Sequence, residues 1–189
     1  MKYTETAIPG VWTMEPEMFR DTRGYFMETF RQADFEKRIG RISFMQDNES
    51  CSVKGVLRGL HYQLAPCSQA KLVRVIQGSV LDVAVDIRRH SPTFGKAVAI
   101  ELSAENKLQL FIPQGFAHGF HVLSSTAVFT YKVDNPYAPA QERGIRFDDP
   151  AIGIDWQLTG RTPVLSEKDM KLPLLKDAEL NFEYNTQKQ

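Results

Sequence analysis

The stretch KLVRVIQGSVLDVAVDIR, Lys71–Arg88, decides the fold class of this chain. It is rich in β-branched residues, which favour strands, and it reads as two strands that meet near Gln77–Gly78. Such strands require a buried sheet, so we predict one here. Successive side chains of the second strand fall on opposite faces of that sheet, with Leu81, Val83, Val85 and Ile87 on one face and Asp82, Ala84, Asp86 and Arg88 on the other.

Strand signals continue on both sides of this stretch, whereas helical signals are few. The strand signals are GYFMETFR at 24–31, KAVAIEL at 96–102, KLQLFIP at 107–113, AHGFHVL at 117–123 and AVFTYKV at 127–133. Helical pattern is limited to QADFEKRIG at 32–40 and to short segments in SEKDM or LLKDAEL. Many short strands between tight turns predict an all-β antiparallel sandwich or barrel. We expect one domain over residues 1–189, with a barrel core at about 43–147 and a largely irregular tail from Asp148 that packs over it.

The composition argues against several classes of protein. Apolar residues make up 42% and charged residues 24%, as in ordinary soluble globular proteins. Lys and Arg together number 23, and so do Asp and Glu, so the chain has no net charge that would attract it to nucleic acid or anionic lipid. A local basic cluster that binds a small anion is compatible with this balance. We find no apolar leader pattern or membrane-length apolar stretch, and expect no membrane partner. Cys51 and Cys67 match no zinc pattern and suit a reducing compartment, so we predict a cytoplasmic protein.

The segment RGLHYQ, residues 58–63, places an arginine, a histidine and a tyrosine beside the predicted core. Either these side chains pack within the core, or the core is hollow and they line it. Further along, a two-residue loop at Ser124–Ser125 would form a hairpin that sets His118 opposite Tyr131. On these residues alone, partly buried strand positions with satisfied hydrogen bonds are the simpler explanation of His118 and Tyr131.

The turn before His118 resembles the second motif of the cupin superfamily, whose members are small double-stranded β-helix barrels. The shared pattern is Pro-x-Gly-x-x-His, here PQGFAH at 113–118. Metal-binding cupins also carry two histidines one residue apart and a glutamate in their first motif. This chain departs from that pattern, because the position two after His61, where the second histidine of the motif would stand, holds Gln63. Lys71 stands where an acidic ligand would be sought. A lysine in the cavity repels a cation, so we expect no metal and no cofactor.

A closer resemblance extends from about Ile8 to Leu174. The segments that carry it, in order, are DTRGYFMETF, FMQDNES, GVLRGLHYQ, AKLVRVIQGSVLDVAVDIRRHSPTFG, IPQGFAHGFHVLS and LSEKD. Together they resemble the dTDP-4-dehydrorhamnose 3,5-epimerases. The resemblance implies a cupin-like double-stranded β-helix (jelly-roll) barrel and a cofactor-independent isomerase. The implied reaction inverts carbons 3 and 5 of dTDP-4-dehydro-6-deoxy-D-glucose through an enolate and gives dTDP-4-dehydro-L-rhamnose.

The resemblance also implies which four residues carry the chemistry. His61 corresponds to the family's proton acceptor, and Asp169 to the carboxylate that orients it. An imidazole titrates near neutrality and gains from a carboxylate on its other nitrogen. Tyr131 matches the family's proton donor on the opposite face of the sugar. Lys71 fits the group that stabilises the developing enolate charge, an interaction worth about 3–4 kcal/mol in other enzymes, and a purely structural lysine is rarely buried.

The nucleoside diphosphate needs further contacts, for which the resemblance supplies candidates. An arginine fork suits phosphate oxygens, so Arg23 and Arg58 are expected phosphate contacts. Phe19 or Phe26 is a candidate for stacking on thymine, and core packing is the alternative for both. In an uninterrupted strand Arg58 and His61 face opposite sides, so we expect a bulge or bend at Gly59, a contact around the barrel rim or one from a partner subunit. The predicted substrate contacts are Arg23, Phe26, Glu28, Gln46, Asp47, Asn48, Arg58, His118, Glu142 and Lys168.

Three other functions share parts of this pattern. A relative that inverts only carbon 3 or only carbon 5 of another dTDP-keto-deoxysugar keeps all four chemical residues. A metal-dependent cupin oxygenase and a catalytically silent sugar-nucleotide binder are more distant alternatives.

The resemblance also implies a homodimer with strands shared between subunits, and GYFMETFR is the candidate for the shared strand. It further implies that the product is used in lipopolysaccharide or cell-wall polysaccharide.

Overall fold

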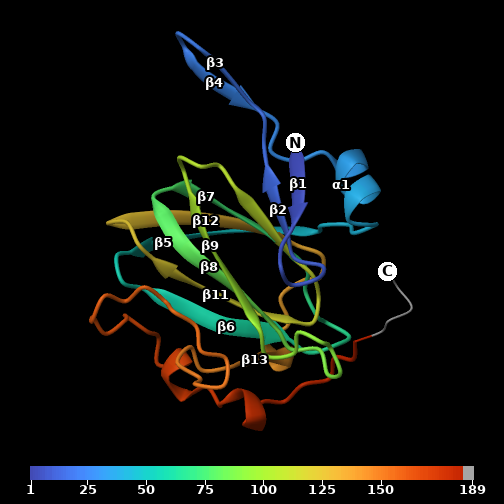
Figure 1. The fold of residues 1–189 in the computed structure, drawn as a ribbon, viewed down its shortest axis with the longest axis vertical. Coiled ribbons are helices and arrows are strands. Elements are labelled where there is room, and N and C mark those ends of the chain that lie inside the picture. The colour runs from blue at the N-terminus through green and yellow to red at the C-terminus, as the bar shows by residue number, and fades with distance from the viewer. Residues whose placement is uncertain (185–189) are drawn as a thin grey trace.

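Two antiparallel sheets face each other and form a jelly-roll barrel (Figure 1). The computed structural model describes residues 1–184, and residues 185–189 of the predicted single domain lie outside the described part. Within residues 1–184 the larger sheet has six strands and the smaller sheet has five. The predicted all-β fold class is therefore confirmed.

The elements have the following bounds. The larger sheet runs in spatial order through β1 (Lys2–Glu5), β2 (Trp12–Glu15), β10 (Gln109–Ile112), β7 (Lys71–Gln77), β12 (Thr126–Val133) and β5 (Gln46–Val53). The smaller sheet runs through β13 (Glu142–Gly144), β6 (Leu57–Gln63), β11 (Phe116–Val122), β8 (Ser79–Asp86) and β9 (Ala97–Ser103). A separate hairpin consists of β3 (Met18–Asp21) and β4 (Gly24–Met27). The helices are α1 (Gln32–Arg38) and the 3₁₀ turns η1 (Pro139–Gln141), η2 (Asp169–Lys171) and η3 (Leu175–Asp177).

The stretch that decides the fold class forms β7 and β8, which are separated by Gly78 as predicted. The two strands belong to different sheets, so this turn carries the chain from one side of the barrel to the other. On β8, Val80 and Ala84 pack in the core between the sheets, whereas Leu81 and Val83 pack on the opposite face beneath the C-terminal segment. Both faces of β8 are therefore buried, and its alternation sends Asp82 toward the lumen.

The predicted hairpin around Ser124–Ser125 is wrong. β11 pairs with β6 and β8 in the smaller sheet, whereas β12 pairs with β5 and β7 in the larger sheet. The Ser124 hydroxyl accepts a hydrogen bond from the Ser79 amide and donates one to the Thr126 carbonyl, each at 2.8 Å, and these bonds hold the crossing between the sheets. His118 and Tyr131 therefore line the interior from opposite sheets instead of pairing along one.

A bulge at Gly59 brings Arg58 and His61 to the same side of β6. Between β6 and β11, His61 pairs with His118 and Arg58 pairs with Phe120, so β6 carries one extra residue between these pairs. Gly59 has a φ of +121°, and a Cβ added there would lie 2.5 Å from the backbone of β11, so only glycine fits. The predicted bulge is confirmed, and both side chains reach one cavity.

Substitution of Gly119 by alanine is expected to destabilise the fold by about 1–3 kcal/mol, the cost of overpacking a filled core. The added Cβ would lie 2.6 Å from the Arg58 carbonyl oxygen and 3.1 Å from the Gly59 Cα, so β6 would have to move away from β11. Urea unfolding followed by circular dichroism gives the free energy of unfolding of both proteins. An unchanged value would mean that the two strands have room to separate, against this packing.

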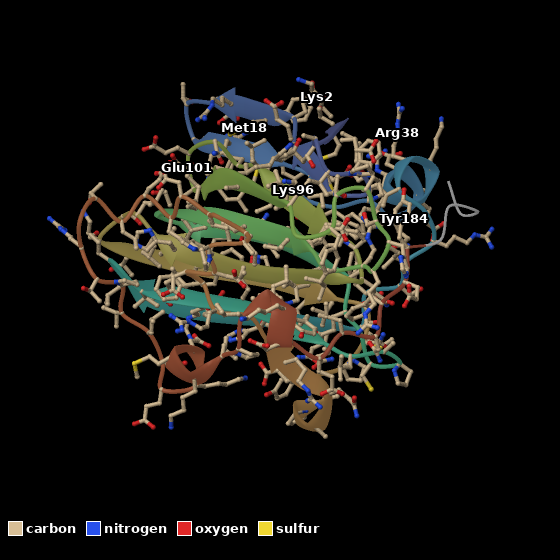
Figure 2. The ribbon with its side chains drawn as sticks, turned by 60° about the horizontal axis from the view of Figure 1, so that its bottom comes forward. Lys2, Met18, Arg38, Lys96, Glu101 and Tyr184 are labelled. Atoms are coloured by element: carbon tan, nitrogen blue, oxygen red, sulfur yellow. The ribbon has the colours of Figure 1, made fainter. Side chains whose placement is uncertain are left out.

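The segment after residue 147 covers the outer face of the smaller sheet, as its orange and red ribbon shows in Figures 1 and 2. Trp156, Leu175 and Phe182 bury their side chains against the outward-facing residues of β6 and β8. The Tyr62 hydroxyl donates a hydrogen bond to the Glu179 carbonyl oxygen at 2.8 Å. The prediction of a C-terminal tail that packs over the barrel is therefore confirmed.

The predicted helical segments are present and short. α1 ends just before Gly40, and the two C-terminal segments contain η2 and η3. None of the helices within the described part of the chain is long and apolar enough to cross a bilayer.

The hairpin of β3 and β4 extends from the body as an arm, which is seen at the top of Figure 1. It covers only part of the predicted strand GYFMETFR, because the strand stops at Met27. Phe19 and Phe26 lie opposite each other on the arm and are 56% and 70% exposed. Large aromatic side chains this exposed are candidates for contact with another molecule.

Candidate active site

A cavity of about 420 Å³ lies between the two sheets, which we call the lumen cavity. Its walls come from β5, β6, β7, β11, β12 and the C-terminal segment. All four chemical residues predicted from the sequence line it, together with three of the predicted substrate contacts. Its polar and charged lining residues are Ser50, Arg58, His61, Lys71, His118, Tyr131, Ser166, Lys168 and Asp169.

His61 and Asp169 form a hydrogen-bonded pair on the smaller-sheet side of the lumen cavity. The His61 Nε2 lies 2.6 Å from the Asp169 Oδ1, and the aspartate side chain is 3% exposed whereas the imidazole is 26% exposed. Burial acts to raise the pKa of Asp169, but the hydrogen bond and charge of His61 leave that pKa below its ordinary value. An ionised carboxylate fixed behind a partly open imidazole is the arrangement of an oriented general base.

The C-terminal segment holds Asp169 in place. Its backbone amide donates to the Ser166 hydroxyl at 3.1 Å, and η2 begins at Asp169 itself. Leu172, at the end of this turn, packs over Gly144, where an added Cβ would lie 2.7 Å from the Leu172 Cδ1. Gly144 in turn pairs with His61 across β13 and β6. The absence of a side chain at Gly144 therefore lets the aspartate approach the histidine.

Lys71 and Tyr131 reach the lumen cavity from the larger sheet. Burial lowers the pKa of the Lys71 ammonium to about 8, against attraction from Asp82 and Glu142. Burial also raises the pKa of the Tyr131 phenol, which Arg58 opposes. Near neutral pH the lysine is therefore largely a cation and the tyrosine keeps its proton. The cavity has an imidazole base on one wall, and an ammonium and a phenol on the other.

A second histidine–carboxylate pair, which the sequence reasoning did not assign, lies deeper in the barrel. The His118 Nε2 is 3.0 and 2.9 Å from the two oxygens of Asp82, whose side chain is fully buried. His118 pairs with His61 across β11 and β6, so the two imidazoles are neighbours. The signal for Asp82 was present in the sequence, since an aspartate between valines and leucines of a buried strand requires a partner.

Several predicted substrate contacts form a polar group around the lumen cavity. The Arg58 Nε and Nη2 both donate to the Ser52 hydroxyl at 3.1 Å. Glu142 forms an ion pair with Lys168 at 2.5 Å and accepts a hydrogen bond from the Tyr137 hydroxyl at 2.7 Å. A further bond, from the Gln46 side-chain amide to the Asn48 oxygen, measures 2.7 Å. The basic members of this group suit an anionic substrate.

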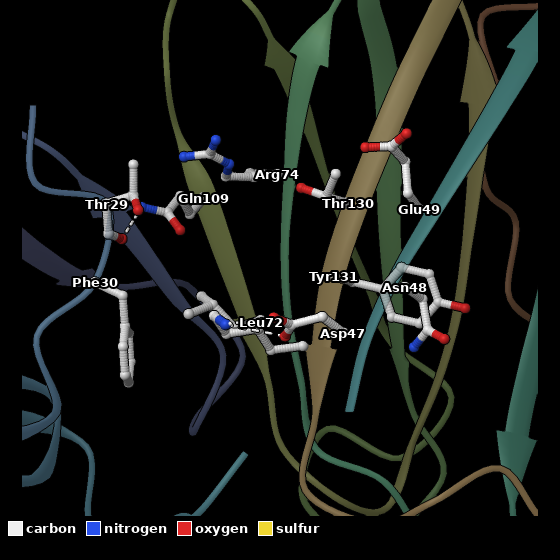
Figure 3. A pocket seen from close by; sticks show the side chains of 11 residues that line it. Thr29, Phe30, Asp47, Asn48, Glu49, Leu72, Arg74, Gln109, Thr130 and Tyr131 are labelled. Carbon is white, nitrogen blue, oxygen red and sulfur yellow. Dashed lines mark hydrogen bonds and ion pairs between the residues drawn. The ribbon is translucent and has the colours of Figure 1, made fainter. Parts of the chain in front are cut away.

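Seven of the ten predicted contacts do not line the lumen cavity itself: Gln46, Asn48 and Glu142 belong to the polar group beside it, and four belong to neither. Asp47 lies on the outer face of the larger sheet, where it binds Lys132 at 2.9 Å and lines a second cavity of about 380 Å³ (Figure 3). The other three belong to the arm and the segment after it, where Arg23 pairs with Asp21 and Glu28 pairs with Arg31. Like the roles of the other predicted site residues, those of Arg23, Phe26, Glu28 and Asp47 stay predictions.

The donor set of the lumen cavity does not resemble a metal site. Within residues 1–184, no group of three or more histidine, cysteine, aspartate or glutamate side chains is placed to hold a metal ion. The imidazoles of His61 and His118 are each hydrogen-bonded to a carboxylate. The cavity is also lined by Lys71, whose ammonium would repel a cation. This set is suited to moving protons and holding negative charge.

The chain matches the family model of dTDP-4-dehydrorhamnose 3,5-epimerase over residues 5–177. The dTDP-4-dehydrorhamnose 3,5-epimerase of Shigella flexneri is 56% identical over 180 residues, which cover 95% of this chain and 98% of that protein. The enzyme of the same name from Salmonella typhimurium is 54% identical over 175 residues, covering 92% and 95%.

Solved structures agree with the fold. The structure of the dTDP-6-deoxy-D-glucose-3,5-epimerase of Legionella pneumophila, in complex with dTDP-4-keto-L-rhamnose, superposes with a TM-score of 0.93. It is 47% identical in sequence, and the match covers 97% of this chain and 98% of that one.

Proposed function

The chain belongs to the dTDP-4-dehydrorhamnose 3,5-epimerase family, and from this premise we propose how its own residues carry out the reaction. The enzyme is an isomerase that converts dTDP-4-dehydro-6-deoxy-D-glucose into dTDP-4-dehydro-L-rhamnose. One observation supports the proposal most directly. His61 with its buried carboxylate lies on one sheet, whereas Lys71 and Tyr131 enter the same cavity from the other.

Proton removal is assigned to His61. The ketone at carbon 4 acidifies the hydrogens on carbons 3 and 5, so an imidazole is a strong enough base to take either one. The bond pair of the broken C–H bond moves into the enolate, and the imidazole becomes a cation. Asp169, 2.6 Å from the His61 Nε2, stabilises that cation and leaves the other ring nitrogen to face the substrate.

Lys71 is assigned to the negative charge that develops on the ketone oxygen. Its ammonium lies in a buried cavity, where a fixed charge interacts more strongly than in water. No reorganisation is needed when the enolate forms, because the charge is already present.

Tyr131 is assigned to the return of a proton on the opposite face of the sugar. Its phenol gives the proton to the enolate carbon, the electron pair of the enolate forms the new C–H bond, and the ketone is restored. The phenolate then regains a proton from solvent, and the imidazolium of His61 loses one. The same two groups serve the second carbon once this exchange has reset them.

The arm supports a homodimer in which each active site is completed by a second copy. Arg23 and Phe26 are predicted substrate contacts, yet they lie on an exposed hairpin and do not line the lumen cavity of their own chain. Delivery to the cavity of a partner explains both facts. We further propose that the protein is a single epimerase unit in the cytoplasm, and that its product serves lipopolysaccharide or cell-wall polysaccharide.

Proton exchange with solvent tests the proposed reaction. The enzyme is incubated with dTDP-4-dehydro-6-deoxy-D-glucose in deuterated water, and the product is analysed by proton NMR. Deuterium at both carbon 3 and carbon 5 is expected, because each inversion returns a proton from solvent. Label at one carbon only would point to a single-site epimerase, and label at neither carbon would rule out the enolate route.

A further inference from the structure

Two charged groups in the barrel, the fully buried Asp82 and the half-buried Lys71, lack an evident counter-charge. The Asp82 carboxylate is 0% exposed, and within residues 1–184 its side chain is hydrogen-bonded to His118 alone. The Lys71 ammonium, in the same described part of the chain, forms no hydrogen bond or ion pair and faces the lumen cavity. A buried charge without a partner is costly, so each of these groups requires compensation from nearby.

His118 does not neutralise Asp82. Burial is the largest influence on this imidazole and lowers its pKa; the charge and hydrogen bond of Asp82 act against burial, and the charges of Lys71 and His61 act with it, so the pKa stays below its ordinary value. The histidine is therefore neutral at neutral pH and provides a hydrogen bond without a charge.

The other carboxylates around Lys71 are already paired, and the exposed Arg58 guanidinium is bonded to the Ser52 hydroxyl. Asp169 is bonded to His61 at 2.6 Å, and Glu142 forms an ion pair with Lys168. Asp82 is the carboxylate left without a cation, and Lys71 is the half-buried cation left without a carboxylate. The titratable and charged side chains that line the lumen cavity with Lys71 are Arg58 and His61 on β6, His118 on β11, Tyr131 on β12, and Lys168 and Asp169 on the C-terminal segment. The charges of Asp82 on β8 and Glu142 on β13 also act on Lys71.

We propose that Asp82 is a positioning residue whose carboxylate keeps Lys71 in its charged form inside the closed barrel and fixes His118 beside it. The inference rests on the proposed function, because the ammonium matters only as the group that holds the enolate charge. Burial lowers the pKa of Lys71 to about 8, and attraction by Asp82 is the largest influence that opposes this fall. Loss of that attraction would lower the pKa of Lys71 further and leave a larger fraction of the lysine neutral near pH 7.

The test is the titration of Lys71 in the Asp82→Asn variant of the full chain. Asparagine keeps the size of the side chain and its hydrogen bond to His118 but removes the charge. Protein labelled with ¹³C at the lysine Cε is titrated by NMR, and the Lys71 signal is assigned by its absence in Lys71→Arg. The midpoint is expected near pH 8 in the parent protein and about one pH unit or more lower in the variant, because a nearby opposite charge shifts a pKa by this amount.

The matched control is Asp86→Asn on the same strand. Asp86 is equally buried, but it is bound by Arg88, Ser91 and Thr93 and is not among the charges that act on Lys71. Its substitution is expected to lower stability and to leave the Lys71 midpoint unchanged. An unchanged midpoint in Asp82→Asn, or an equal fall in Asp86→Asn, would overturn the proposal.

A second variant keeps the test decisive if Asp82→Asn does not fold. His118→Gln retains the Asp82 charge, so the Lys71 midpoint is expected not to fall; a fall of one unit would assign the effect to the imidazole instead. In Asp82→Asn the fall of kcat/KM at alkaline pH is expected to begin at lower pH, together with the NMR midpoint, because the Lys71 ammonium loses its proton at lower pH. The NMR titration needs no substrate, so its outcome is independent of whether deuterium enters carbons 3 and 5.

Discussion

The His61→Asn variant is expected to lose turnover by about 10²–10⁴-fold, the contribution of a positioned general base. The asparagine amide can still donate to the Asp169 carboxylate, but it cannot accept a proton at neutral pH. Both inversion and deuterium exchange at carbons 3 and 5 should fall together, since no proton leaves the sugar. Product formation and label uptake are measured by NMR in the same sample.

His90→Asn is the matched control for this experiment. The His90 side chain is 83% exposed and lies 3.6 Å from Glu183 on the surface, away from the lumen cavity. Its turnover should equal that of the parent protein. Equal turnover in His61→Asn as well would refute the assignment of the base.

The Tyr131→Phe variant is expected to separate exchange from inversion. Phenylalanine keeps the ring that lies 6.1 Å from the ring of Phe129, but it has no proton to give. His61 still removes a proton and, once exchanged with solvent, returns deuterium to the same face. Recovered substrate should therefore be labelled, while formation of inverted product falls by about 10²–10⁴-fold, the usual effect of losing a general acid.

Tyr3→Phe is the control for the loss of a phenol oxygen. The Tyr3 hydroxyl is buried and has no hydrogen-bond partner within the described part of the chain, and its ring packs in the apolar cluster around Met14 and Phe35. Its removal should leave turnover unchanged. If Tyr131→Phe formed inverted product at the parent rate, Tyr131 would not be the proton donor. If it lost exchange to the same extent as inversion, Tyr131 would also be needed for proton removal, against the role assigned to it.

Local patterns in the sequence predicted the strands well and their partners less well. The Lys71–Arg88 stretch gave two strands and the correct turn, because alternation and β-branching are local properties. The strands on either side of Ser124–Ser125 were assigned to one hairpin, because a two-residue loop is the usual sign of a hairpin. In the structure the chain changes sheets there, and the bond from the Ser79 amide to the Ser124 hydroxyl that holds the crossing spans 45 positions. A contact of that separation has no local signature.

The site divides in the same way. The resemblance predicted chemical roles for His61, Lys71, Tyr131 and Asp169, and the structure brings the four to one cavity. Of the alternatives open for Arg58, the structure shows the bulge at Gly59. Asp82 was seen to alternate with apolar residues, but the pattern does not say which face of a strand borders a cavity when both faces are buried.

One hydrogen bond joins the barrel to its tail across 108 positions of the sequence. His61 takes its place when β6 joins its sheet, but its aspartate partner arrives only when the C-terminal segment docks on that sheet's far side. Contacts between such distant residues are slow to form. The oriented base is therefore complete only when the C-terminal segment has docked, so recovery of activity after refolding reports that docking and not the assembly of the sheets alone.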